Sequence, residues 1–214
     1  METIAVIDFE TTGTSPATGA RATEIAAVLV EGGAIVARFQ SLMNSGARVP
    51  AFIEQLTGIS NRMLHGAPPV RAVMHEVARF TRGCPLVAHN AGFDRAFWRA
   101  LMQRAGLEVE ASPEVACTVR LARRLYPEMP NYRLGTLAAW FGLPDAGRAH
   151  RALADAQTTA HLMLQIKHDV RARFRAELGD GEVSHAMLSA LQASHAARLA
   201  RCVRLHSQRV LAAA

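Results

Sequence analysis

A short apolar run that ends in two carboxylates is the feature that most constrains this chain. Residues Ile4 to Ile7 are apolar without interruption, which is typical of a strand buried on both faces of a sheet. Asp8 and Glu10 follow at alternate positions, so their side chains point to the same side of the strand. A hard divalent cation between them would relieve their repulsion, although an acidic strand end that faces solvent fits this stretch equally well.

The rest of the chain alternates strand and helix patterns. The turn Glu31-Gly32-Gly33 is expected to join two strands into a hairpin, which adds an antiparallel portion to the sheet. Later strands and helices follow in alternation; the strands are expected at 24–30, 34–42, 85–88 and 115–118, and the helices at 50–56, 70–82, 94–105 and 134–141. This order predicts an α/β fold with a mixed central sheet of about five strands, the second antiparallel, flanked by helices.

The C-terminal part of the sequence is expected to be helical. One long helix should run from Arg151 to about Leu178, and a single final helix from roughly Glu182 to Leu211. We therefore expect a domain at 1–175 and a helical C-terminal extension at 176–214. Arginines cluster on one face of the final helix: Arg198, Arg201 and Arg209. The extension could pack on the domain with a solvated basic face, form a homodimer interface, or bind nucleic acid.

Composition and charge narrow the class of partner. The formal net charge is +6 with histidines neutral, which favours a polyanionic partner, although arginine-rich usage would also follow from a GC-rich genome. Cys84, Cys117 and Cys202 are far apart and form no C-x-x-C pair, which argues against a disulfide framework or a zinc site. Since no apolar run is long enough to span a bilayer, we expect a cytoplasmic protein with no membrane partner.

A second acidic position follows the expected strand at 85–88. The segment His89-Asn90-Ala91-Gly92-Phe93-Asp94 lies where open α/β sheets bind ligands, at the carboxyl end of a strand. Asp94 could join the acidic pair of the first strand. The structural alternative is that Asp94 caps the N-terminus of the next helix.

A third acidic position lies near a histidine, in His150-Arg151-Ala152-Leu153-Ala154-Asp155. Five residues within one helix would set His150 and Asp155 roughly 140° apart, so they could not share a face. They can converge only if His150 lies on the loop before the helix, and Gly147 upstream supports that placement. A lone histidine at a helix start is more often structural.

Together these motifs resemble the DEDDh 3′–5′ exonucleases. The resemblance covers about residues 3 to 170 and includes Thr11-Thr12-Gly13 after Glu10 and Leu56-Thr57-Gly58-Ile59 before Pro68. The family contains the proofreading epsilon subunit of bacterial replicative polymerases and ribonuclease T. The resemblance implies a ribonuclease H-like exonuclease fold.

The resemblance also implies a role for each site residue. Two divalent cations, Mg2+ or Mn2+, would be held by Asp8, Glu10, Asp94 and Asp155, and His150 would be the general base. The 3′-terminal nucleotide would lie against the following residues: Thr11, Thr12, Leu56, Ile59, Asn90 and Phe97. For Phe97 a place in the core is a close alternative, and Asn90 could hold the loop turn instead.

The predicted function is a metal-dependent 3′–5′ exonuclease acting on single-stranded or frayed DNA, with a polymerase or repair system as partner. The arginine-bearing helical tail differs from the flexible tail of the usual replicative subunit. An enzyme that trims RNA 3′ ends is the alternative within the class. Outside it, the alternatives are a non-catalytic module that binds strand ends and a two-metal phosphatase for small nucleotides.

Overall fold

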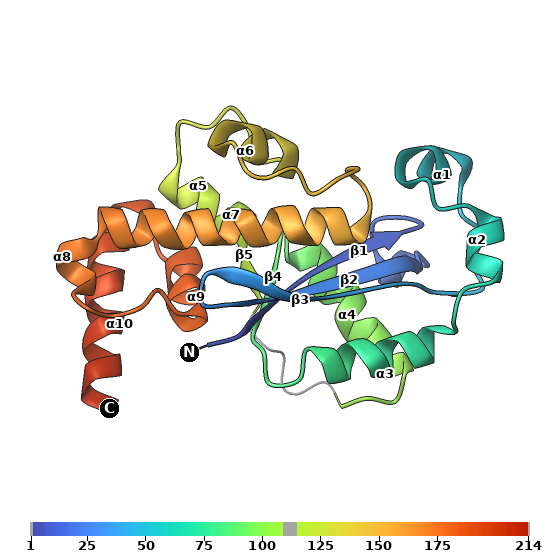
Figure 1. Cartoon of the computed structure of the whole chain (residues 1–214), viewed down its shortest axis with the longest axis horizontal. Coiled ribbons are helices and arrows are strands. Elements are labelled where there is room, and N and C mark those ends of the chain that lie inside the picture. The colour runs from blue at the N-terminus through green and yellow to red at the C-terminus, as the bar shows by residue number, and fades with distance from the viewer. Residues whose placement is uncertain (1, 109–114, 214) are drawn as a thin grey trace.

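The protein is built on one mixed sheet with helices on both faces (Figure 1). The computed structural model describes residues 2–108 and 115–213. The strand order is β3-β2-β1-β4-β5, with β2 antiparallel to β1 and β3, and with β4 parallel to β1 and β5. The strands are β1 Ile4–Thr11, β2 Ala22–Glu31, β3 Ala34–Leu42, β4 Leu86–Ala88 and β5 Ala116–Cys117. The predicted mixed sheet of five strands is confirmed.

Strand β1 lies at the centre of this sheet, between β2 and β4, and its apolar residues are no more than 1% exposed from Ile4 to Ile7. Alternation divides its side chains between two cores. Ile4 and Val6 join the core beneath α7, whereas Ala5 and Phe9 join the core on the other face. By the same alternation Asp8 points to the α7 side of the sheet.

Helices cover both faces of the sheet. Helices α3 (Val70–Phe80) and α4 (Gly92–Arg104) supply apolar side chains to one core, and α7 (Ala152–Arg173) crosses the other face. In Figure 1, α7 runs above the strands and α3 lies below them. The remaining elements before α7 are η1 Pro16–Thr18, α1 Ala51–Thr57, α2 Asn61–His65, α5 Thr118–Leu125 and α6 Leu134–Phe141.

The C-terminal helices are more broken than the sequence suggests. The chain forms α7, α8 (Arg175–Leu178), α9 (His185–Ala193), η2 (Ala196–Arg198) and α10 (Leu199–Ala213). The predicted single helices at 151–178 and 182–211 are therefore wrong. Phe174 leaves helical geometry and is buried in the core, and His195 Nδ1 accepts a hydrogen bond from the Ala197 N–H, which starts a new helical turn.

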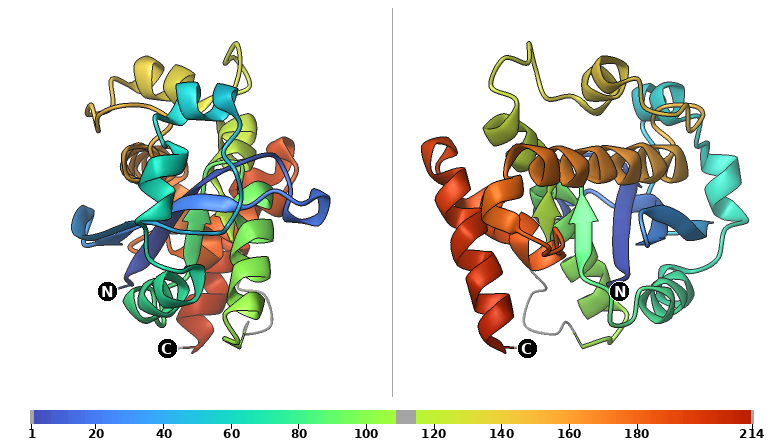
Figure 2. Two further views of the ribbon diagram at one scale, coloured as in Figure 1. Left: turned by 90° about the vertical axis from the view of Figure 1, so that its right-hand side faces the viewer. Right: turned by 60° about the vertical axis from the view of Figure 1, so that its left-hand side comes forward.

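The C-terminal segment shares a core with the sheet. Its buried apolar residues belong to the same cluster as Val6 and Val87: Val183, Met187, Leu188, Leu191, Leu199 and Val203. The Gln192 side chain accepts a hydrogen bond from the Cys117 N–H at 2.7 Å and donates one to the Val115 carbonyl at 3.3 Å. This amide pairs with the edge strand β5 as a neighbouring strand would. Figure 2 shows α9 and α10 beside that end of the sheet.

None of the helices within the described residues combines the length and the apolar character needed to cross a membrane. All three cysteines carry free thiols; Cys117 is buried, and Cys84 and Cys202 are partly exposed.

Candidate active site

The first part of the site is the carboxyl end of β1. Asp8 lies opposite Ala26 and Glu10 opposite Glu24 in the β1–β2 pairing, and the register shifts just after Glu10. Glu10 is 9% exposed. Thr11 donates its hydroxyl hydrogen bond to the Gly13 carbonyl, which tightens the turn that follows the strand.

Asp94 reaches this strand end from α4. Helix α4 begins at Gly92 and its N-cap is Ala91, so Asp94 lies within the first turn and does not cap the helix. Its Oδ1 accepts a hydrogen bond from the Phe9 N–H at 3.2 Å, and the residue is 1% exposed. A carboxylate in the first turn is also favoured by the helix dipole. Asp94 is thereby fixed beside the acidic pair of β1.

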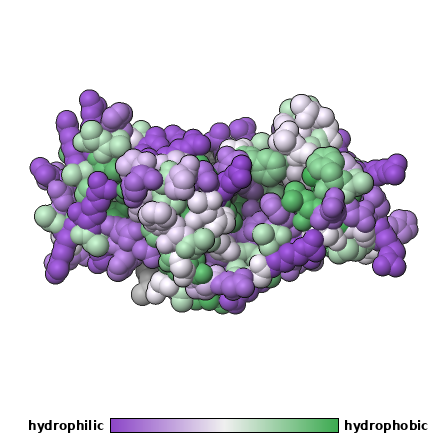
Figure 3. Space-filling view, turned by 90° about the horizontal axis from the view of Figure 1, so that it is seen from above, coloured by the Kyte–Doolittle hydropathy of each residue, from purple (hydrophilic) through white to green (hydrophobic). Residues whose placement is uncertain are grey.

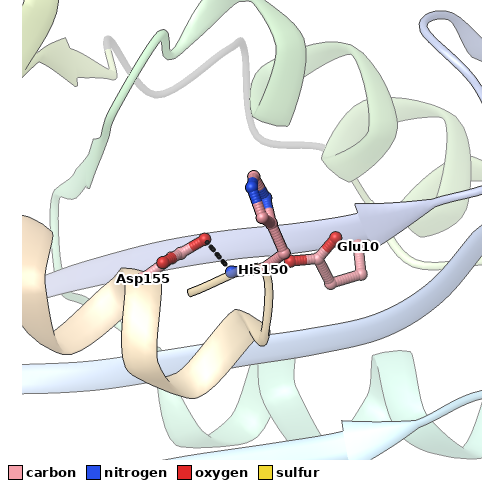
Figure 4. Close-up of side chains that lie close together, drawn as sticks. All are labelled: Glu10, His150 and Asp155. Carbon is pink, nitrogen blue, oxygen red and sulfur yellow. Dashed lines mark hydrogen bonds between the residues drawn. The ribbon is translucent and has the colours of Figure 1, made fainter. Parts of the chain in front are cut away.

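His150 lies outside α7, as the spacing to Asp155 predicted. Helix α7 begins at Ala152, and His150 has a φ of 60°, a left-handed conformation that is unusual for a residue other than glycine. The His150 N–H donates to Asp155 Oδ2 at 3.2 Å (Figure 4). Ligand atoms of Glu10, His150 and Asp155 lie within 4.8 Å of one another. The loop, β1 and α7 therefore bring these three side chains to one place.

Glu24, on the neighbouring strand β2, supports this arrangement, and the sequence did not lead us to predict it. It is buried on β2 and accepts hydrogen bonds from the Arg151 guanidinium at 2.7 and 3.1 Å, and from the Ala152 N–H at 3.0 Å. The ion pair ties the start of α7 to the sheet. A lone carboxylate in an otherwise apolar strand requires a partner, and that signal could have identified it.

The acidic groups repel one another strongly. Burial raises the pKa of Asp8 well above its usual range, and the carboxylates of Asp94, Asp155, Glu10 and Glu24 raise it further. Burial also raises the pKa of Asp94 to about 7, even though the hydrogen bond from the Phe9 N–H acts in the opposite direction.

The same repulsion acts on the two carboxylates nearest His150. Burial, and then Asp155 and Glu24, raise the pKa of Glu10 to about 8, while Arg151 lowers it. Burial raises the pKa of Asp155, and the His150 N–H opposes that rise. A cluster of hard oxygen ligands whose charges destabilise one another fits divalent cations such as Mg2+ or Mn2+, because the cations would supply the missing positive charge.

His89 is a structural residue of the site. Its Nε2 lies 3.0 Å from the Tyr132 carbonyl, which can only accept, so Nε2 carries the proton and Nδ1 accepts from the Thr118 hydroxyl at 2.8 Å. Burial lowers the pKa of His89 to about 4, so the ring is neutral near pH 7. His89 thus anchors the loop of Asn90, whose φ is 62°.

A cleft of about 910 Å3 opens beside His150 and Asp155. It lies between α6, the start of α7 and the loop that joins them, and Asn90 and Tyr132 contribute to its wall. The cleft is large enough for a ligand of nucleotide size.

The residues expected to bind substrate come from three places: helix α1, the wall of the cleft, and the turn after β1. Leu56 on α1 is 46% exposed, and its neighbour Phe52, which the sequence reasoning missed, is 66% exposed. Figure 3 shows hydrophobic surface on the right-hand part of the upper face, over the side of the molecule where α1 lies. Asn90 lines the cleft, and the Thr12 hydroxyl accepts from the Arg21 N–H at 2.9 Å.

Two of the residues expected to bind substrate are buried in the structure. Phe97 is 1% exposed and packs between the rings of Phe9 and Phe93, at centroid distances of 6.3 and 5.0 Å, so it offers no face for a base. Ile59 is fully buried with Val49 and supports the α1–α2 segment from within. Both are apolar residues whose periodicity fits a core position as well as a binding position.

Comparisons with known proteins agree with this geometry. A family model described as exonuclease matches residues 5–163. The 3′–5′ exonuclease DinG of Bacillus subtilis is 41% identical over 166 residues, which is 78% of this chain and 18% of that protein. A PolC-type DNA polymerase III of Bacillus cereus is 41% identical over 169 residues, 79% of this chain and 12% of that protein. The chain therefore spans less than a fifth of the length of either relative.

Solved structures share the fold. Exonuclease X, in complex with 5′ overhanging duplex DNA, is 30% identical, has a TM-score of 0.61, and is matched over 77% of this chain and 91% of that chain. The nuclease domain of 3′hExo, a DEDDh family member bound to rAMP, has a TM-score of 0.67 at 20% identity over 78% of this chain and 92% of that one. From the family model, these relatives and the shared ribonuclease H-like fold, we conclude that the chain belongs to the DEDDh exonuclease family.

Proposed function

We propose that this protein is a metal-dependent 3′–5′ exonuclease that removes nucleoside 5′-monophosphates from 3′ ends of single-stranded or frayed DNA. One observation carries the proposal: carboxylates from β1, α4 and α7 converge with His150 at the edge of a cleft of nucleotide size. The name of the first relative supports 3′–5′ exonuclease activity, and the name of the second, a DNA polymerase III, supports DNA as substrate and a polymerase as partner. We propose a role in proofreading or repair on that basis.

The proposed ligands of two divalent cations, Mg2+ or Mn2+, are Asp8, Glu10, Asp94 and Asp155. When bound, such ions supply Lewis-acid stabilisation of the attacking and leaving oxygens at phosphorus. The protein's own contribution is to hold these four carboxylates in place. The Phe9 N–H fixes Asp94, the His150 N–H fixes Asp155, and the strand itself aligns Asp8 with Glu10.

His150 is the proposed general base. It takes a proton from the attacking water, whose oxygen forms the new bond to phosphorus. The bond between phosphorus and the O3′ of the preceding nucleotide breaks, O3′ takes a proton from solvent to become the new 3′-hydroxyl, and the terminal nucleotide leaves with its 5′-phosphate. His150 is exposed at the cleft, whereas both ring nitrogens of the neutral His89 are already hydrogen-bonded within the protein. His150 is thus the better placed of these two imidazoles.

The 3′-terminal nucleotide is proposed to lie between the Thr11-Thr12 turn and the exposed apolar side chains of α1, Leu56 and Phe52, with Asn90 in the cleft wall. An exoribonuclease remains the second candidate, since a structural neighbour is described as bound to rAMP. We further propose that residues 1–175 carry the activity and 176–214 form an extension. The homodimer through that extension and the cytoplasmic location stay predictions.

The test is product analysis on DNA and RNA oligonucleotides labelled at either end, with and without Mg2+, for the wild type and Asp8→Asn. We expect mononucleotides from the 3′ end, dependence on Mg2+, and a loss on the order of 10³-fold in Asp8→Asn. The substitution keeps the side-chain shape and removes a repelled charge, so the free energy of unfolding in chelator should not fall. Full activity in Asp8→Asn would refute the mechanism, and binding without hydrolysis under saturating Mn2+ would favour the non-catalytic module.

A further inference from the structure

The C-terminal helices carry a groove surrounded by arginines. The groove, about 350 Å3 in volume, lies between α9 and α10. Arg198, Arg201 and Arg209 are exposed around it, with His206 beside them. The remaining lining residues are Ala190, Ser194, Cys202 and Leu205.

This groove has little negative charge near it. Residues 183–214 contain no aspartate or glutamate. Within the part of the chain that the structure describes, the arginines of this segment make one ion pair, between Arg204 and Glu177 at 3.8 Å, and Arg204 does not line the groove. Three guanidinium groups without a carboxylate partner raise the local positive potential, and an anion in the groove would lower it.

The positive charge continues from the groove along α5. The Arg124 Nε donates to the Ser194 carbonyl at 2.6 Å, which joins α5 to the groove wall. Arg120 and Arg123 are exposed on the same helix, and residues 115–127 also lack acidic side chains. Burial, and then the charges of Arg120 and Arg123, lower the pKa of Arg124, as expected where cations are crowded.

Helix α5 leads from the groove to the catalytic cleft. The Arg123 guanidinium lies over the Tyr132 ring, 5.6 Å from its centroid, and Tyr132 lines the cleft that contains His150. The Tyr132 carbonyl also accepts the hydrogen bond from His89. A continuous series of contacts thus connects the groove, α5 and the cleft.

We propose that this groove binds the sugar-phosphate backbone of the nucleic-acid strand whose 3′ end occupies the catalytic cleft, with α5 as the path between them. The inference rests on the proposed function and extends it to residues outside 5–163, the range of the exonuclease family model. Guanidinium groups bind phosphate through paired hydrogen bonds, without reading base identity. A second copy of the chain is a poorer occupant, because a symmetric contact would bring two arginine clusters together with no acidic residue in the segment.

The first test compares two triple variants that each remove three positive charges. Arg198→Gln/Arg201→Gln/Arg209→Gln changes the groove. Arg71→Gln/Arg79→Gln/Arg82→Gln changes exposed arginines on or next to α3, on another side of the molecule. Affinity for labelled single-stranded DNA is measured in chelator over a range of salt concentrations and lengths.

For long oligonucleotides, we expect the groove variant to reduce the slope of log affinity against log salt by about 2, which corresponds to three phosphates at about 0.7 each. A dinucleotide, too short to reach the groove, should bind all three proteins alike. The α3 variant should keep the wild-type slope. Equal losses of affinity and of salt slope in the two triple variants would overturn the proposal.

Cys202 offers a second test in the unmodified protein, because it lines the groove and its thiol is free and partly exposed. A long oligonucleotide should slow alkylation of Cys202 and leave that of Cys84, next to α3, unchanged. If saturating DNA does not slow the alkylation of Cys202, the proposal that the groove binds the strand is wrong, even if the protein degrades 3′ ends. Protection of Cys202 without any hydrolysis supports the groove and refutes the catalytic proposal instead.

Discussion

His150 shows how a single backbone conformation places the proposed general base. Its φ of 60° turns the chain so that the N–H meets Asp155 while the imidazole remains exposed at the cleft. A left-handed conformation in a non-glycine residue costs on the order of 1–2 kcal/mol. The hydrogen bond to Asp155 and the anchoring of Arg151 on Glu24 oppose that cost.

At the residue scale we predict the effect of His150→Asn. Asparagine tolerates the left-handed conformation, so the loop should keep its shape while the general base is lost. The exonuclease rate should fall by about 10²- to 10⁴-fold, because the other imidazole that lines the cleft, that of His89, has both ring nitrogens hydrogen-bonded within the protein. Rates together with thermal unfolding check this, because a misfolded loop would also lower the unfolding temperature. An unchanged rate would exclude His150 as the base.

At the element scale, α9 acts as a neighbour for the short strand β5. Gln192 satisfies the Cys117 N–H and the Val115 carbonyl on the edge of β5 that pairs with no other strand, and His185 Nε2 donates to the Leu86 carbonyl at 2.8 Å in β4. Because Thr118 follows β5 directly and holds His89, this edge also supports the loop of Asn90.

We predict that Gln192→Leu lowers the free energy of unfolding by about 1–3 kcal/mol, because it leaves a buried N–H and a buried carbonyl without partners. Gln208→Leu is the matched control, since Gln208 is exposed on α10 and should change stability by no more than about 0.5 kcal/mol. Urea unfolding measures both. Equal stabilities of the two variants would mean that α9 does not depend on this amide.

At the scale of the whole molecule, the carboxylate cluster should make stability depend on metal and pH. The folded protein raises the pKa of Glu10 to about 8 and of Asp94 to about 7, so it retains protons that the unfolded chain has already lost. Where the unfolded state binds fewer protons, stability falls as pH rises. His89, with its pKa lowered to about 4, acts in the opposite direction only up to about pH 6.5.

We therefore predict that the metal-free protein loses stability between about pH 6.5 and 8, by roughly 1 kcal/mol per pH unit for each proton that the folded state still holds and the unfolded chain has lost. Mg2+ should restore stability, and more at the upper end of that range, because the cation replaces the protons. Denaturant unfolding in chelator and in Mg2+ measures both effects. Asp8→Asn removes a carboxyl group whose pKa the fold also raises, and is expected to flatten the metal-free curve. A metal-free protein whose stability rises over this range would contradict the proposed arrangement of charges.

The sequence by itself determined those features that depend on local periodicity. Four apolar residues in a row predicted the central strand, alternation placed Asp8 and Glu10 on one side, and 100° per residue required His150 to lie outside the helix of Asp155. Each of these follows from the geometry of a single element, so a window of a few residues contains all the information.

Only the tertiary structure decided which distant residues support the site. Glu24 and Arg151 are 127 positions apart, and Cys117 and Gln192 are 75 apart, yet both contacts hold segments of the candidate site in place. Burial also decided that Phe97 and Ile59 belong to the core, while the equally apolar Leu56 is exposed. The local sequence pattern predicts which secondary structure a residue belongs to and which side of it the residue faces. Solvent exposure and long-range pairing depend on how whole elements pack, which no short stretch of sequence specifies.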